Sequence, residues 1–423
     1  MLALQRLGDV LTAARVTDAL SRRRSTLAVE VIHWDATTQA AALLPGLAAR
    51  HALPFAALRK GARAHTLAPL RLLASRLADL NGPRAFDRVV NLSSTRFACW
   101  LAPALLAEGG TMHGPSIDAH GRFVSSHPSI AYLNEWGVDP ELGTFAHQDL
   151  YALAAGVRMT GWGGLRPVGG RRTGPVVLHP FGSERAKDWR TPLEWRELIG
   201  RLRAQLGRPC VLTGGPGDAR GLAEIASGTD ATISTAPLSA SIELLAMATG
   251  LVSVDTVAIH AAAAVDCPTV VLRQGPAQGL AFVPGSNALC VDASRDSATP
   301  EEVTMLAERQ FSDTPAPLFV DPSWRMRIRV REGHRDEFGL LGLQQPSWIK
   351  NDDAALVDDE SDRLWRVAWR SELERDTPPA NVLEALMNGR GRFDAQRWQA
   401  LLQSPSGLGV AARACQRPNR RAA

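Results

Sequence analysis

Short apolar runs alternate with amphipathic stretches along the first half of the chain. Three apolar runs are each followed by a helical pattern: 1–4 by 10–23, 27–33 by 36–49, and 87–92 by 96–106. Strands that alternate with helices favour a parallel sheet with crossover helices. Residues 1–165 are therefore predicted to form a Rossmann-like domain.

The second half repeats this alternation with stronger strands. The predicted strands are 175–179, 209–213, 250–254 and 269–272, and the helical patterns between them are 192–206, 219–226 and 240–249. A Gly- and Arg-rich stretch over 161–174 has no periodicity and is typical of an interdomain linker. Residues 166–319 are thus predicted to form a second doubly wound α/β domain.

Beyond residue 320 the sequence changes in character. It becomes rich in Trp and Arg, and it carries an acidic patch over 352–362. We expect residues 320–423 to be a helical C-terminal extension, to which the pattern assigns no role.

Composition narrows the class of protein. A chain of 423 residues with 45% hydrophobic and 21% charged residues is long enough for two globular domains and a tail. Its apolar runs fall short of the roughly 18 residues needed to span a bilayer, so contact with the inner membrane is expected to be peripheral at most. The N-terminus does not resemble a secretory signal, and the five cysteines form no close pair, which favours a cytoplasmic protein.

The charge and the glycine motifs exclude several functions. A formal net charge of +4 favours anionic ligands such as phosphates. No basic run is interleaved with aromatic residues, so nucleic acid is not an expected partner. Neither half contains Gly-x-Gly-x-x-Gly or a Walker loop, which argues against dehydrogenases and P-loop enzymes.

Candidate ligand-binding residues follow the predicted strands, because open α/β sheets bind ligands beyond the carboxyl ends of their strands. After 175–179 come Gly182, Ser183 and Lys187, just before a helix that we expect to be capped by Thr191 with Pro192 at its first position. Backbone N–H groups and an ammonium can surround a phosphate there. The alternative is an ordinary turn with a surface lysine.

Two further strand ends carry small or polar residues. Thr213, Gly214 and Gly215 end one strand, where the glycines indicate either close approach of a nucleotide or a tight turn that needs positive φ. Asp255, Thr256 and His260 end another. Asp255 could accept sugar hydroxyls or act as a helix N-cap, and His260 could support this loop or be a buried, hydrogen-bonded histidine.

Seven segments of the second half share an order and spacing with a known family. They are Phe181-Gly182-Ser183, Lys187-Asp188-Trp189-Arg190, Leu212-Thr213-Gly214-Gly215, Ser241-Ile242-Glu243-Leu244, Asp255-Thr256-Val257-Ala258-Ile259-His260, Ala261 to Ala264, and Pro268 to Pro276. Together they resemble the heptosyltransferases of glycosyltransferase family nine. The sequence departs from the family at Val257, where the family has Gly in Asp-Thr-Gly.

The first half adds one more similar element, Leu7-Gly8-Asp9-Val10. In the family, the Asp of this turn is taken as the general base that deprotonates the acceptor hydroxyl, which by position is Asp9 here. A structural role, in which Asp9 caps a helix starting at Val10, is compatible with this chemistry because a helix N-terminus keeps a carboxylate ionised.

The resemblance covers residues 1–320 and implies an activity. It implies a GT-B fold, in which two Rossmann-like domains face a cleft, and an inverting transferase that needs no metal or cofactor. The donor implied by the resemblance is ADP-heptose or a related ADP-sugar, with Lys187 and the Gly182 and Ser183 amides holding the diphosphate. The acceptor would be a lipopolysaccharide core or a protein. The alternatives are a sugar-nucleotide epimerase and a non-catalytic nucleotide-sugar binding protein.

Overall fold

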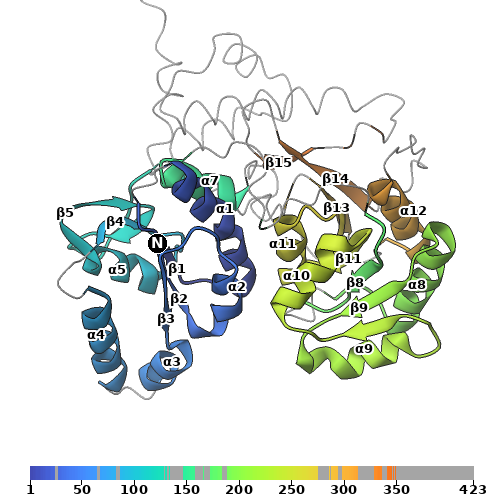
Figure 1. Ribbon diagram of the computed structural model, residues 1–423, viewed down its shortest axis with the longest axis horizontal. Helices are drawn as coiled ribbons and strands as arrows, with labels where there is room; N and C mark the ends of the chain where they lie inside the picture. Colours follow the sequence, from blue (N-terminus) through green and yellow to red (C-terminus); the bar gives the residue numbers. More distant parts are fainter. Residues whose placement is uncertain are drawn as a thin grey trace, which may run out of the picture.

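The structure is a computed structural model. It describes residues 1–23, 27–63, 67–81, 86–127, 129–130, 133, 146–157, 165, 172–182, 188–274, 285, 287–293, 298–312, 328–335, 341–344, 346 and 348. Two α/β units stand side by side, the first built from the N-terminal part of the chain and the second from residue 176 onward (Figure 1). None of the described helices has the length and apolar character needed to cross a membrane.

The first unit has a parallel sheet at its centre. Its strands are β1 (Leu2–Ala3), β2 (Glu30–Trp34), β3 (Ala49–Leu53), β4 (Phe86–Val90) and β5 (Leu106–His113). β1, β2 and β3 pair in that order, β4 pairs with β5, and a parallel bridge from Leu2 to Asn91 joins the two groups. A small antiparallel pair, β6 (Pro115–Ile117) with β7 (Phe123–Ser125), follows.

Helices connect these strands and cover the sheet. They are α1 (Leu7–Arg23), α2 (Thr38–Ala42) after a short 3-10 turn, α3 (Phe55–Arg63), α4 (Ala68–Asn81), α5 (Arg96–Ala104) and α7 (His147–Ala154). The prediction of a helix over 36–49 is wrong in its second part, because α2 ends at Ala42 and residues 49–53 form β3. The turn between them contains Gly46, whose φ of +65° suits glycine.

The second unit is built on an eight-stranded sheet in the order β10-β9-β8-β11-β12-β13-β14-β15. Its strands are β8 (Val176–His179), β9 (Cys210–Thr213), β10 (Thr232–Ser234), β11 (Gly250–Val254), β12 (Thr269–Gln274), β13 (Ala288–Ala293), β14 (Ile328–Arg335) and β15 (Leu341–Gln344). Its helices are α8 (Pro192–Leu206), α9 (Ala219–Ala226), α10 (Leu238–Met247), α11 (Val257–Ala264) and α12 (Pro300–Phe311). The six strands from β10 to β13 are parallel, as expected for a doubly wound unit.

The described part of the C-terminal extension differs from the helical expectation. β14 pairs antiparallel with β13, and β15 pairs antiparallel with β14, so both strands continue the second sheet past residue 319. An ion pair between Arg331 and Asp292 also joins β14 to β13. The remaining residues of the extension, and most of the linker predicted over 161–174, lie outside the described residues.

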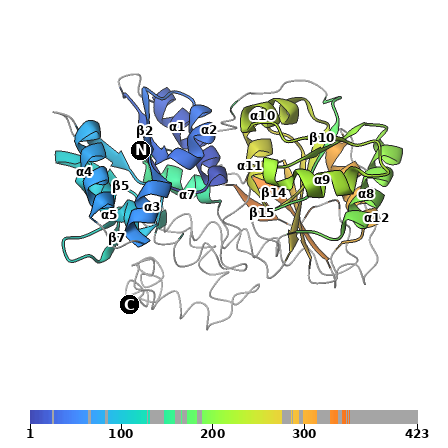
Figure 2. The same ribbon diagram turned by 90° about the horizontal axis from the view of Figure 1, so that it is seen from below.

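The two units share a hydrophobic core. α1 packs against α11, and Val10 and Leu11 of the first unit belong to the same buried cluster as Ala258 and Ala261 of the second. Figure 2 shows α1, α2 and α7 on the side of the first unit that faces α10 and α11. β15 also reaches the first unit, where the Leu341 carbonyl accepts a hydrogen bond from the Ala146 amide at 3.0 Å.

Candidate active site between the two units

A cavity of about 330 Å³ lies where the two units meet, beside the ends of β8 and β9. Leu7 and Gln39 line it from the first unit. The second unit contributes Val177, His179, Thr213, Gly214, Gly215, Pro216, Thr235, Ala236, Pro237, Leu238, Ser241, Leu245, Leu251, Val257, Ala258 and Ala261. The carboxyl ends of parallel strands are where ligands bind in open α/β sheets. Of the residues singled out in the sequence, Thr213, Gly214 and Gly215 line the cavity, whereas Gly182, Asp255, Thr256 and His260 are not part of its lining.

Two polar side chains of the cavity lining, Thr213 and His179, are neutral. Thr213 is buried, and its hydroxyl lies 3.2 Å from the Leu178 carbonyl and 3.0 Å from His179 Nδ1. Because the hydroxyl donates its one proton to the carbonyl, His179 Nδ1 is the donor to Thr213 Oγ1. Burial lowers the pKa of His179 to about 4, so the ring is uncharged at neutral pH.

The two glycines after β9 border the cavity without a left-handed backbone. Neither has positive φ, and Gly215 has φ −74°, so the explanation by a tight turn that needs positive φ is wrong. A Cβ on Gly214 would lie 3.1 Å from atoms of Asp218 and Leu222. The Gly215 amide donates to Asp218 Oδ2 at 2.8 Å. Close packing within the protein accounts for Gly214, and its contact with a nucleotide stays a prediction.

The turn after β8 is described only in part. The Gly182 amide donates to Asp188 Oδ1 at 3.1 Å, so in this structure it is already hydrogen-bonded. Ser183 and Lys187 lie outside the described residues. Trp189 is buried against Trp195, with ring centroids 4.9 Å apart, and its carbonyl accepts a hydrogen bond from Trp195 Nε1 at 2.8 Å. Trp189 thus anchors the end of the turn to α8.

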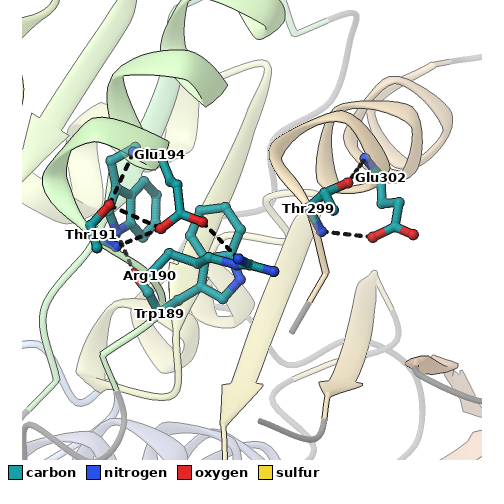
Figure 3. A network of polar contacts seen from close by, with 7 residues as sticks. Trp189, Arg190, Thr191, Glu194, Thr299 and Glu302 are labelled. Carbon is teal, nitrogen blue, oxygen red and sulfur yellow. Dashed lines mark hydrogen bonds and ion pairs between the residues drawn. The ribbon is translucent and has the colours of Figure 1, made fainter. Parts of the chain in front are cut away.

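The predicted cap of the following helix is confirmed. The Thr191 hydroxyl accepts from the Glu194 amide, the Glu194 carboxylate accepts from the Thr191 amide, and Pro192 opens α8. Figure 3 shows this capping box beside the matching one formed by Thr299 and Glu302 at the start of α12. The N-termini of α8 and α12 are therefore both fixed by capping boxes.

The turn before α11 has a different geometry from the one expected for a capping Asp. Thr256 is the N-cap, with φ −150° and ψ −178°, and it makes no side-chain capping hydrogen bond. Asp255 precedes it, so the interpretation of Asp255 as the N-cap is wrong. Val257 is the first helical residue, has no positive φ and lines the cavity. A β-branched side chain is therefore unstrained where the family has Gly.

Asp9 lies in the first turn of α1. The helix begins at Leu7, earlier than the expected Val10, and Asp9 is its third residue. Asp9 Oδ2 accepts a hydrogen bond from the Arg6 amide at 3.2 Å. The carboxylate thus stabilises the start of the helix by accepting from one of its first backbone amides.

His260 of the second unit meets the turn that carries Asp9. A Cβ on Gly8 would lie only 2.6 Å from His260 Cδ2, so the imidazole lies directly on the backbone of Gly8. This contact brings together two residues that the sequence assigned to opposite domains. It also explains why position 8 holds a glycine, since a larger residue would displace the ring.

Two residues of α7 complete this cluster and were missed in the sequence. The Tyr151 hydroxyl accepts from Gln5 Nε2 at 3.2 Å, and burial together with the Asp9 charge raises the pKa of Tyr151 above its usual range. His147 lies beside Tyr151, with ring centroids 5.9 Å apart. Burial and the nearby His260 lower the pKa of His147 to about 4. The rarity of Tyr, with two in the chain, was the only available signal.

Metal binding was not among the expectations. Within the described residues there is no group of three or more His, Cys, Asp or Glu side chains that could hold a metal ion. Independence from metal remains a prediction from the family resemblance.

Part of the sequence matches a known protein family. Residues 168–278 match the family model of glycosyltransferase family 9 (heptosyltransferase). No curated protein matches the sequence.

Solved structures resemble this fold over about three quarters of the chain. E. coli heptosyltransferase WaaC with ADP has a TM-score of 0.56 at 19% identity, over 73% of this chain and 98% of that one. E. coli ADP-heptose lps heptosyltransferase II has a TM-score of 0.52 at 17% identity, over 73% and 97%. The glycosyl transferase family 9 protein from Veillonella parvula has a TM-score of 0.53 at 13% identity, over 74% and 96%.

These likenesses agree with the two-unit architecture. At such low identities the solved structures establish the fold, and the family match applies to residues 168–278. The second unit therefore carries a glycosyltransferase domain of the family 9 (heptosyltransferase) type over residues 168–278, and the two units together have the GT-B fold.

Proposed function

We propose that the chain transfers a heptose, with inversion, from ADP-heptose to a hydroxyl of a lipopolysaccharide core or of a protein. One observation carries this proposal. The cavity is lined mainly by the second unit, yet Leu7, in the same helical turn as Asp9, also lines it. A donor in the cavity would therefore lie beside the turn that holds the proposed base.

The reaction we propose is a single displacement. The acceptor oxygen bonds to the anomeric carbon of the sugar while the bond from that carbon to the diphosphate oxygen breaks, and ADP leaves with the bonding electrons. The Asp9 carboxylate takes the acceptor proton. Because the attack and the departure occur on opposite faces, the anomeric configuration inverts.

The cavity suits the nucleoside part of the donor. Its wall combines apolar side chains with a few fixed polar groups, such as Thr213 and Ser241, which is typical of small-molecule sites. Similarity to an enzyme solved with ADP supports adenine as the base. Asp255, Thr256 and His260 would face the sugar side, while Gly182, Ser183 and Lys187 would hold the diphosphate.

The proposed compartment is the cytoplasm. The four cysteines within the described residues, Cys99, Cys210, Cys267 and Cys290, are all buried and unpaired. Free thiols are usual in reducing compartments, and this supports the location.

Donor consumption tests the proposal against its alternatives. Purified protein is incubated with ADP-heptose and with heptose-free lipopolysaccharide or acceptor protein, and both partners are followed by mass spectrometry. A transferase releases ADP and adds one heptose to the acceptor. An epimerase keeps the sugar on the nucleotide and changes only its configuration, and a binding protein consumes nothing. Either of those two results would overturn the proposal.

The role of Lys187 has its own test. Calorimetry with ADP should show weaker binding for Lys187→Ala and partial recovery for Lys187→Arg, because the two cations differ in geometry. Lys60→Ala, on α3 and outside the cavity lining, is the matched control and should bind ADP normally. Unchanged affinity in Lys187→Ala would remove this residue from the donor site.

A further inference from the structure

One segment of the first unit has an unusual charge pattern. Residues 36–78 contain six Arg and Lys side chains and no Asp or Glu, although the whole chain has 47 basic and 43 acidic residues. The rest of the chain therefore has slightly more acidic than basic residues. This segment includes α3 and most of α4, and these two helices carry five of its six basic residues.

The two helices form a packed hairpin at the edge of the first unit. A Cβ on Gly61 of α3 would lie 2.2 Å from Pro69 of α4, so the helices are in close contact there. Figure 1 shows α3 and α4 together at the lower end of the first unit, on the side away from α8 and α12. The hairpin is thus a formed surface that stands apart from the cavity.

Apolar side chains are exposed on the same hairpin. Leu67 and Leu70 are 65% and 59% exposed, and Phe55 at the start of α3 is exposed as well. Leu67, Leu70, Arg71 and Ala74 have the spacing of one helix face, and all four are exposed. Leu73, beside this face, is buried. The first turn of α4 therefore presents leucines and an arginine outward together.

The cations of the hairpin are available to an external anion. Arg59, Lys60 and Arg71 are exposed and form no salt bridge with any described residue. Arg59 lies over the Phe55 ring, 5.9 Å from its centroid. Apolar side chains flanked by lysine and arginine are the pattern of elements that lie in the interface of an anionic bilayer.

We propose that the α3–α4 hairpin docks on an anionic phospholipid bilayer, with Leu67 and Leu70 inserted among the headgroups and Lys60 and Arg71 next to lipid phosphates. Nucleic acid fits less well, because exposed leucines lie among the cations. A second copy of the same face is disfavoured because like charges would meet. This inference goes beyond the proposed reaction and does not depend on it.

Vesicle flotation tests the proposal on the full-length protein. The wild type should bind vesicles of phosphatidylglycerol and phosphatidylcholine, bind phosphatidylcholine vesicles far less, and be released by salt at about 1 M. Lys60→Gln with Arg71→Gln should weaken binding about 25-fold, at about fivefold for each cation. Leu67→Gln with Leu70→Gln should weaken it at least about tenfold.

Matched variants on the second unit are the controls. Leu193→Gln removes a leucine that is 69% exposed on α8, and Arg220→Gln removes an exposed arginine on α9. Both should bind the anionic vesicles like the wild type. All variants should keep the thermal unfolding midpoint and the donor turnover of the wild type with a water-soluble acceptor, which separates docking from catalysis and from folding.

Three results would overturn the proposal. The first is equal binding, or no binding, to both kinds of vesicle. The second is an equal loss in the control variants. The third is a dimer in gel filtration that Leu67→Gln with Leu70→Gln splits while no vesicle binding is seen, which would make the hairpin an interface between copies of the chain.

Discussion

The cavity lining and the cluster around Asp9 lie next to each other but differ in chemistry. The lining is neutral, since burial keeps His179 uncharged and Thr213 is satisfied within the protein. The cluster gathers titratable groups, with Asp9 and Tyr151 from the first unit and His260 from the second. We infer that the lining selects the donor by shape, whereas the cluster moves protons.

The largest expected effect is at Asp9. Asp9→Asn keeps an oxygen that can accept from the Arg6 amide but removes the proposed base, so kcat should fall by about 100-fold or more while donor affinity changes little. Asp9→Ala should lose the same activity and some helix stability. Steady-state kinetics with donor titration measures both, and near-normal turnover in Asp9→Asn would remove Asp9 from the mechanism.

Low pH should destabilise the fold through the buried histidines of both regions. Burial lowers the pKa of His147 and of His179 to about 4, below the unfolded value near 6.5. The unfolded chain therefore binds protons that the folded chain does not, and stability is lost as pH falls from about 6.5 towards 4, by up to about 1.4 kcal/mol per pH unit for each histidine.

The matched variants for this pH dependence are His147→Gln and His120→Gln. The free energy of unfolding, measured with denaturant between pH 7 and pH 4, should depend less steeply on pH in His147→Gln than in the wild type. His120 is exposed, so His120→Gln should keep the pH dependence of the wild type. If both variants kept the wild-type slope, the burial of a neutral His147 would be contradicted.

Gly8 joins the cluster to the second unit. Gly8→Ala places a methyl group 2.6 Å from His260 Cδ2, so it should cost about 1 to 2 kcal/mol of stability and lower kcat roughly tenfold by displacing the ring. Gly200→Ala is the matched control, because open space surrounds it within α8, and it should stabilise by about 0.5 to 1 kcal/mol. Thermal unfolding and kinetics that fail to separate the two variants would argue against the contact.

A variant of the cavity lining should lower donor affinity and leave kcat unchanged, the opposite of the effect expected at Asp9. Ala236→Trp puts an indole at the exposed edge of the cavity and should weaken ADP binding about tenfold, while kcat at saturating donor stays near the wild-type value. Calorimetry measures the affinity. A loss of kcat with unchanged affinity would erase the distinction between the lining and the cluster.

The smallest effect is expected at Val257. Because Val257 begins α11 without positive φ, Val257→Gly should destabilise by about 0.5 to 1 kcal/mol through added freedom of the unfolded chain and leave ADP-heptose affinity unchanged. A tenfold or greater gain in affinity would instead indicate that Val257 holds the backbone away from the diphosphate.

Burial explains which elements could be predicted from the sequence. All five residues of β11 are buried and only Ser253 among them is polar, so this mostly apolar strand was predicted with its observed bounds. β3 is Ala-Arg-His-Ala-Leu, with exposed and half-buried residues alternating, and its alanines extended the preceding helical pattern. The Thr191 cap was predictable because its signal lies within four consecutive residues.

The cluster around Asp9 could not be predicted from local sequence patterns. The family resemblance pointed to Asp9 and to His260, but their neighbourhood arises because α1 packs against α11. Tyr151 and His147 lie far from Asp9 in the chain, and neither belongs to a motif. β14 and β15 were missed because the Trp- and Arg-rich composition around them masks two short strands.

The anomeric configuration of the product tests the central claim most directly. Proton NMR of the heptosylated acceptor, compared with the ADP-heptose supplied, shows whether the bond was formed with inversion. A donor beside the Asp9 turn, attacked once by a hydroxyl that Asp9 deprotonates, predicts inversion. Retention would require a second displacement or a front-face path and would contradict the role proposed for Asp9.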